Sequence, residues 1–98
     1  MSKNKIPNIH PGEILDEDFL RPWNITAYRL AKDLHIPQTR ISLILKGKRR
    51  ITADTALRLS KYFGNSPHFW LNLQDEFDLR EEKKNIESEL NTIHTISV

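Results

Sequence analysis

The stretch TAYRLAKDLHIPQTRISLILK, which runs from Thr26 to Lys46, decides the fold. Apolar residues recur in its first half at spacings of three and four, the period of one helical face. These residues are Ala27, Leu30, Ala31 and Leu34. Thr26 precedes them and is a suitable N-cap. The pattern therefore predicts a short amphipathic helix over about residues 26–34.

A second short helix is predicted directly after the first. The tripeptide His35-Ile36-Pro37 is too short for anything except a turn. Pro37 suits a helix start, because its missing N–H has no intrahelical partner there. We expect a helix over about residues 37–46, ended by Gly47 in the left-handed conformation. Its core positions are Ile41, Ile44 and Leu45. Two helices joined by so short a turn form a helix-turn-helix.

The second helix of this motif should present a polar edge to the outside. Ala31, Ile36 and Ile41 are expected to close the angle between the two helices, which leaves the start of the second helix exposed. Amides read adenine edges, and a threonine offers both a hydroxyl and a methyl group to thymine. The expected base contacts are Gln38, Thr39, Arg40 and Leu43. An alternative is that Leu43 belongs to the core and the helical phase differs slightly.

Four cations occupy five consecutive positions at the end of this motif, from Lys46 to Arg50. Interaction with the helix dipole accounts for one or two of them, whereas contact with DNA phosphates accounts for all four. The expected phosphate contacts are Thr26, Tyr28, Ser42, Lys46, Lys48, Arg49 and Arg50. If a dimer neutralises about 6–10 phosphates, its affinity for DNA should fall about 10³–10⁵-fold between 50 and 200 mM salt.

The charge distribution along the chain supports a polyanionic partner. The segment from Arg29 to Lys61 holds nine Lys or Arg and only two acids, a net charge of +7. Because the 98-residue chain has a net charge of +2, the residues outside this segment carry a net charge of −5. A basic middle between acidic flanks is typical of nucleic-acid binding. A solvated surface with chance clustering of cations is the alternative.

Three further helices complete an all-α fold of five. The first covers about residues 11–20 with Pro22 forcing its end, and its apolar side is Ile14, Leu15 and Phe19. The next is capped by Thr52, runs over about residues 53–63 and ends at Gly64, with core positions Ala56, Leu59, Ser60 and Phe63. The last opens at Ser66-Pro67.

The last helix has more aromatic residues than so small a core needs. Trp70, Leu73 and Phe77 are therefore expected at a dimer interface. Packing inside the monomer is the alternative for Phe69 and Leu73. Beyond Leu79 the chain is polar, and residues 81–98 are expected to form a helical or frayed tail. Residues 1–9 are expected to be a flexible segment before a domain over residues 10–80.

The sequence from Ile25 to Leu79 resembles the Cro/C1-type helix-turn-helix family. The segments HPGEILDEDFL (residues 10–20) and SPHFWLNLQ (residues 66–74) narrow the resemblance to HigA, or VapI-like, antitoxins. The resemblance implies a five-helix lambda-repressor-like domain, a homodimer, and binding to a palindromic double-stranded DNA operator. It also implies neutralisation of a HigB-type toxin, an mRNA-cleaving endonuclease. Alternatives are a stand-alone phage-type repressor and a protein that chiefly inhibits a toxin.

Two positions depart from the pattern of that family. His35 stands where glycine is common, so a side chain would occupy a left-handed position. Pro37 stands at the N-cap position of the second helix, where Ser or Thr is common. The loss of that hydroxyl removes a group that commonly supports the helix start and is expected to alter the phosphate contacts there.

The composition argues against an enzyme. The chain has no cysteine, its four histidines are scattered, and it has neither a glycine-rich phosphate loop nor a nucleophile beside a base. The acids between Glu13 and Asp18 crowd one surface helix, which favours solvation over a metal site. We expect no metal and no cofactor. Without a signal peptide or a long apolar run, the protein is expected in the bacterial cytoplasm, associated with the nucleoid and not with membranes.

Overall fold

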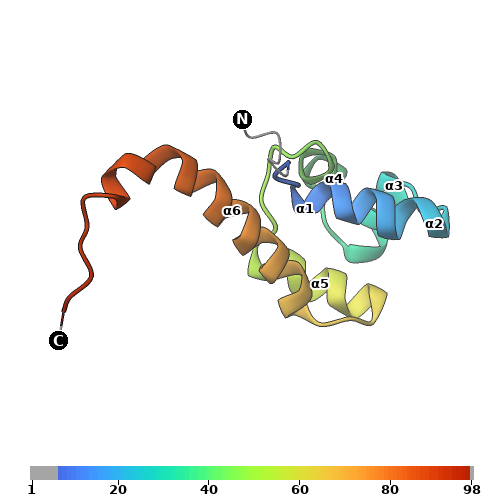
Figure 1. Ribbon diagram of the computed structural model, residues 1–98. Helices are drawn as coiled ribbons and strands as arrows, with labels where there is room; N and C mark the ends of the chain where they lie inside the picture. Colours follow the sequence, from blue (N-terminus) through green and yellow to red (C-terminus); the bar gives the residue numbers. More distant parts are fainter. Residues whose placement is uncertain (1–6, 98) are drawn as a thin grey trace.

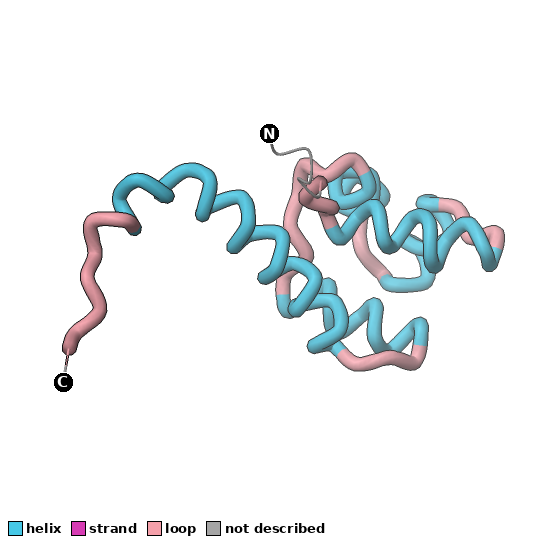
Figure 2. The backbone as a smooth tube through the Cα atoms, viewed as in Figure 1, coloured by secondary structure: helices cyan, strands magenta, loops and turns pink. Residues whose placement is uncertain are grey.

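A computed structural model describes residues 7–97, and this part of the chain holds helices and loops without strands (Figure 2). The elements are α1 (Pro11–Ile14), η1 (Leu15–Leu20), α2 (Arg21–Trp23), α3 (Ala27–Leu34), α4 (Gln38–Leu45), α5 (Ala53–Phe63) and α6 (Pro67–Leu90). The first three form one continuous helix, so the described chain has five helices. The predicted all-α, five-helix class is confirmed.

The first helix passes the proline that was expected to end it. Its middle, η1, is a π-helix, in which the Arg21 N–H reaches back five residues to the carbonyl of Asp16. This wider turn accommodates Pro22, which lacks an N–H and clashes with a regular α-helical turn. The helix ends at Trp23, where Asn24 takes the left-handed conformation. The prediction that Pro22 stops the helix was wrong.

The start of the first helix packs directly on the end of α4. A Cβ atom added at Gly12 would lie 1.8 Å from the carbonyl oxygen of Ile44. That oxygen belongs to the backbone and cannot move aside like a flexible side chain. Gly12 is therefore required for the close approach of α1 to α4, the helix that carries the expected base contacts.

We expect Gly12→Ala to destabilise the protein by about 2–3 kcal/mol, because overpacking against a rigid backbone forces both helices apart. Urea unfolding followed by circular dichroism measures this loss. Gly64→Ala is the matched control for a glycine at a helix end, since a Cβ there meets nothing within 4 Å and carries only the cost of a left-handed φ of 76°. Equal stability of Gly12→Ala and the wild type would contradict the close approach.

The predicted helix ends are largely confirmed. Thr26, Thr52 and Ser66 each accept a hydrogen bond from a backbone N–H in the first turn of the helix that follows. Gly47 and Gly64 both have positive φ, at 74° and 76°. The fourth predicted helix has the expected bounds, Ala53–Phe63.

Trp70 lies at the centre of the core and is completely buried. Its ring contacts three phenylalanines, at centroid distances of 4.8 Å to Phe19, 6.2 Å to Phe63 and 4.9 Å to Phe69. The indole N–H donates to Asn65 Oδ1 at 3.0 Å. Since a side chain with no accessible surface cannot contact a second subunit, the predicted place of Trp70 at a dimer interface was wrong.

The last helix is far longer than its buried face. α6 continues from the core to Leu90, with a kink at Ile86, where φ is −118° and ψ is 17°, and it projects away from the other helices (Figure 1). Ion pairs along its exposed part, Arg80–Glu76 and Lys84–Glu81, support the helix where it buries little. The helical alternative for the tail is thus the one observed as far as Leu90, and residues 93–97 have no regular structure.

The beginning of the described chain is attached to α6. The Asn8 side-chain amide donates to the carbonyl of Phe77 at 3.0 Å and to Glu81 at 2.9 Å. Residues 7–9 therefore lie against α6, although they fall in the segment expected to be flexible. Residues 1–6 of that segment lie outside the described part.

His10 connects this N-terminal segment to the helix that follows it. Its Nδ1 accepts the Gly12 N–H at 2.9 Å as an N-cap, and its ring packs edge-on against Phe77 at 4.9 Å. Burial lowers the pKa of His10 below 6.5, and the opposing effects of the Asp78 charge and a hydrogen bond to the Arg49 backbone do not restore it. The folded protein therefore favours the neutral ring.

A histidine with a lowered pKa stabilises the folded state fully above its unfolded pKa near 6.5, and this stability is lost as the pH falls through its folded pKa. Protonation also removes the N-cap acceptor, worth about 1 kcal/mol. We expect His10→Asn, which keeps an acceptor that does not titrate, to lose about 1 kcal/mol less than the wild type between pH 7.5 and 5. Thermal melts at both pH values measure the difference, and identical losses would contradict this role.

Candidate nucleic-acid interface

α4 presents one polar face to solvent and buries the other. Ile41 and Ile44 are fully buried, whereas the opposite face lines a shallow surface depression. That depression is formed by Gln38, Thr39, Ser42, Leu43 and Lys46. Leu43 is 37% exposed and outside the core cluster, which removes the alternative that it is a core residue. Four of the expected DNA contacts at the surface of α4 therefore share one face with Lys46.

The turn between α3 and α4 has the compact geometry expected for this motif. His35 takes the left-handed conformation with φ 61°, as its position in the turn requires. The next residue, Ile36, donates its N–H to the carbonyl of Ala31 at 3.0 Å and is buried with Ile41. Pro37 is the N-cap residue of α4, which begins at Gln38 and has no side-chain cap. The two helices thus form a rigid corner.

The cations after α4 divide into two groups. Lys46, Lys48 and Arg49 are exposed in the loop between α4 and α5. Arg50 instead pairs with Asp78 on α6 at 2.5 Å. Burial raises the pKa of Asp78, but hydrogen bonds from Arg50 and Gln74 outweigh that effect and leave the pKa below its usual value. All four expected phosphate-binding cations of this segment are exposed, and of these four only Arg50 has an ion-pair partner among the described residues.

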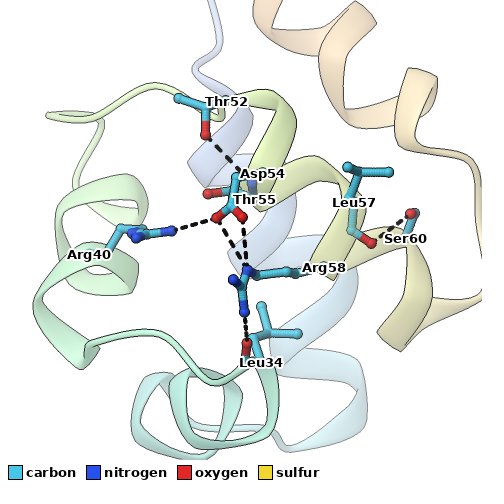
Figure 3. Close-up of polar contacts among 8 residues, drawn as sticks. All are labelled: Leu34, Arg40, Thr52, Asp54, Thr55, Leu57, Arg58 and Ser60. Atoms are coloured by element: carbon cyan, nitrogen blue, oxygen red, sulfur yellow. Dashed lines mark hydrogen bonds and ion pairs between the residues drawn. The ribbon is translucent and has the colours of Figure 1, made fainter.

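Arg40 lies apart from the exposed face of α4. Its Nη1 contacts Asp54 on α5 at 3.0 Å, and its side chain is only 25% exposed (Figure 3). Hydrogen bonds from Arg40 and then Arg58 hold the pKa of Asp54 below its usual value. The sequence placed Arg40 with the base contacts, but in the free protein its guanidinium is directed to α5. An ion pair between residues on two different helices cannot be predicted from the spacing of residues along one helix.

The two expected contacts on α3 are both exposed. The Thr26 hydroxyl accepts the Arg29 N–H at 3.0 Å, so it caps α3. Tyr28 follows in the first turn and has most of its side chain in solvent. These positions leave both residues free to approach a phosphate from the start of α3, while their contact with DNA stays a prediction.

Comparison with known proteins identifies the family. The helix-turn-helix family model matches residues 24–71. Virulence-associated protein I of Dichelobacter nodosus is 49% identical over 88% of this chain and 80% of its own length. A solved HigA-family addiction module antidote protein from Coxiella burnetii is 47% identical, with a TM-score of 0.86 over 94% of this chain and 100% of that one.

The chain belongs to the HigA family of helix-turn-helix proteins. The Pseudomonas aeruginosa antitoxin HigA, solved with the higBA promoter, is 35% identical and superposes with a TM-score of 0.89 over 93% of this chain and 100% of that one. The resemblance recognised from residues 10–80 is therefore confirmed. Between residues 7 and 97, this HigA-family chain has no helix with the length and apolar character needed to cross a membrane.

A buried glutamine supports the loop that carries the cations. Gln74 of α6 accepts the Ile51 N–H at 2.7 Å and donates to Asp78 at 2.9 Å. The Asp78 carboxylate in turn receives Arg50. This network fixes the end of the loop to α6. Sequence reasoning missed it, although one signal was present: Gln74 is a polar residue on the same helical face as Trp70 and Phe77.

The other two residues expected at a dimer interface are partly covered within the monomer. Leu73 and Phe77 are half-buried and line a groove together with Pro7, Asn8 and Ile9. More exposed apolar side chains lie further along the chain, notably Leu79, Leu90 and Ile93. Aromatic content alone could not distinguish the covered positions from the exposed ones.

Proposed function

We propose that this protein is a DNA-binding antitoxin of the HigA type that represses its own operon. The observation that carries the proposal is the exposed polar face of α4 beside the solvent-facing cations Lys46, Lys48 and Arg49. The face offers side chains able to read bases, and the cations are placed to bind phosphates. The structure determined for the P. aeruginosa relative with promoter DNA supports the same role here.

In this proposal two protomers pair around a two-fold axis. Each inserts α4 into the major groove of double-stranded DNA, with half-sites about one helical turn, roughly 34 Å, apart. Gln38, Thr39 and Leu43 face the bases. Thr26 and Tyr28 approach phosphates from α3, while the loop cations approach them from the other side. A palindromic operator follows from the symmetry of the dimer.

Footprinting on the DNA upstream of the protein's own gene tests this function. We expect a protected palindrome, and a gel-shift affinity that falls about 10³–10⁵-fold between 50 and 200 mM salt. Protection without sequence preference, or binding that hardly responds to salt, would overturn the proposal.

The partner protein in this proposal is a HigB-type toxin, an mRNA-cleaving endonuclease, bound in the bacterial cytoplasm. The antitoxin itself has no catalytic role. A small toxin reading frame beside the gene, whose product co-purifies with the chain and loses its RNase activity on binding, is the expected result. Absence of such a neighbour would favour a stand-alone repressor, and DNA binding would remain.

The homodimer is proposed to form through α6, whose far half projects from the domain (Figure 1). Leu79 and Leu90 are exposed on this part of the helix, and apolar side chains of that kind are typical of the centre of a dimer interface. Light scattering should report a dimer for the wild type and a monomer for Leu79→Glu. A dimer that persists in Leu79→Glu would place the interface elsewhere.

A further inference from the structure

The basic segment between Arg29 and Lys61 contains only two acids, and both are paired with cations. Asp33 contacts Arg29 at 3.4 Å and accepts the Tyr62 hydroxyl at 2.6 Å. Asp54 is different, because its partner is a cation of α4, the helix that carries the expected base contacts. It lies in the first turn of α5 and receives Arg40 of α4 (Figure 3).

Asp54 is held in place independently of Arg40. Arg58, one turn further along α5, donates its Nε to both carboxylate oxygens of Asp54, at 3.2 and 3.1 Å. The same guanidinium donates Nη1 to the carbonyl of Leu34 at 2.8 Å, at the end of α3. Arg58 therefore fixes the carboxylate between α3 and α5, where it is ready to receive the Arg40 side chain.

The pair determines which side chains α4 can offer to DNA. With its guanidinium on Asp54, Arg40 is not among the residues that line the exposed face of α4. Without this acceptor, a long cationic side chain would be free beside a DNA groove. A free arginine there would bind the nearest phosphate, and phosphate contacts carry no direct sequence information.

We propose that Asp54 is a positioning residue for sequence recognition: by holding Arg40 against α5, it leaves base reading to Gln38, Thr39 and Leu43 on the exposed face of α4. This inference rests on the proposed DNA-binding function. It assigns to Asp54 a role beyond supporting the fold. Removal of the Asp54 carboxylate should change the preference for operator over random DNA more than it changes the affinity for the operator.

The test compares Asp54→Asn, Arg40→Ala and the double variant in binding to operator and random DNA. In Asp54→Asn one more phosphate contact per protomer, two per dimer, should steepen the salt dependence on random DNA by about 1.8, which is about 60-fold in affinity at about 0.1 M salt. On random DNA the protein can take any register in which the released Arg40 guanidinium contacts a phosphate. The operator complex is fixed by base contacts, so its affinity should change less than about threefold.

Two further variants separate positioning from simple charge. Asp33→Asn removes the same charge from the other acid of the segment and should leave the salt dependence unchanged. Asp54→Glu keeps a carboxylate within reach of Arg40 and should retain the selectivity of the wild type. In the double variant the gain on random DNA should vanish, because Arg40 is absent. Circular dichroism checks that every variant is folded.

The proposal is overturned if the double variant keeps the gain of Asp54→Asn, or if Asp33→Asn shows the same gain. It is also overturned if Arg40→Ala lowers operator affinity more than about tenfold while random DNA is bound as before, since Arg40 would then read bases. A wild-type protein that does not prefer its operator would instead refute the proposed function itself, before any variant is measured.

Discussion

Trp70→Ala is expected to lower the free energy of unfolding by about 3–5 kcal/mol, the cost of removing a large aromatic side chain from a core. Trp70 has no accessible surface and touches rings from three parts of the chain, including Phe19 and Phe63. Its loss would leave a cavity where the first helix, α5 and α6 meet, and Asn65 would lose its donor.

Urea unfolding followed by circular dichroism measures this change. The chain offers a matched control in its other tryptophan, because Trp23 is 69% exposed. Trp23→Ala should change the free energy of unfolding by no more than about 0.5 kcal/mol. Similar losses for the two variants would contradict the placement of Trp70 at the centre of the core.

Lys48→Ala combined with Arg49→Ala is expected to weaken DNA binding about 10³-fold or more near 0.1 M salt. A dimer would lose four phosphate contacts, so the dependence of log K on log salt should become shallower by about 3.6. Because phosphate contacts are independent of sequence, operator and random DNA should lose affinity alike.

Gel shifts over a salt series measure both the affinity and its slope. The control is Lys83→Ala with Lys84→Ala, which removes the same charge from the projecting part of α6. That control should bind DNA almost as the wild type does. If it loses as much affinity as the loop variant, binding depends on total charge and not on the loop after α4.

Local signals predicted the DNA-binding unit well. Apolar residues at helical spacing located α3 and α4, and the threonine, serine and glycine caps located most helix ends. These features depend on neighbours within a few residues, which a sequence displays directly. The same local character explains why the outward face of α4 could be assigned before its structure was known.

The errors concern interactions between distant residues. Trp70 is surrounded by Phe19 and Phe63, which lie 51 and 7 positions away, and no local pattern distinguishes such a core residue from one at an interface. The sequence also did not reveal the contact of Arg40 with Asp54 on another helix, while base contact by Arg40 stays a prediction. α6 continues to Leu90 as a solvated helix with exposed ion pairs, which hydrophobic periodicity does not detect.

The role of α4 can be tested most directly by measuring Gln38→Ala against operator and random DNA at one salt concentration. A side chain that reads a base contributes about 1–3 kcal/mol of discrimination. The dimer makes this contact in both half-sites, so we predict that operator affinity falls about 30-fold or more while affinity for random DNA and the salt dependence stay the same. Equal losses on both DNAs, or no loss on the operator, would contradict sequence reading by this face.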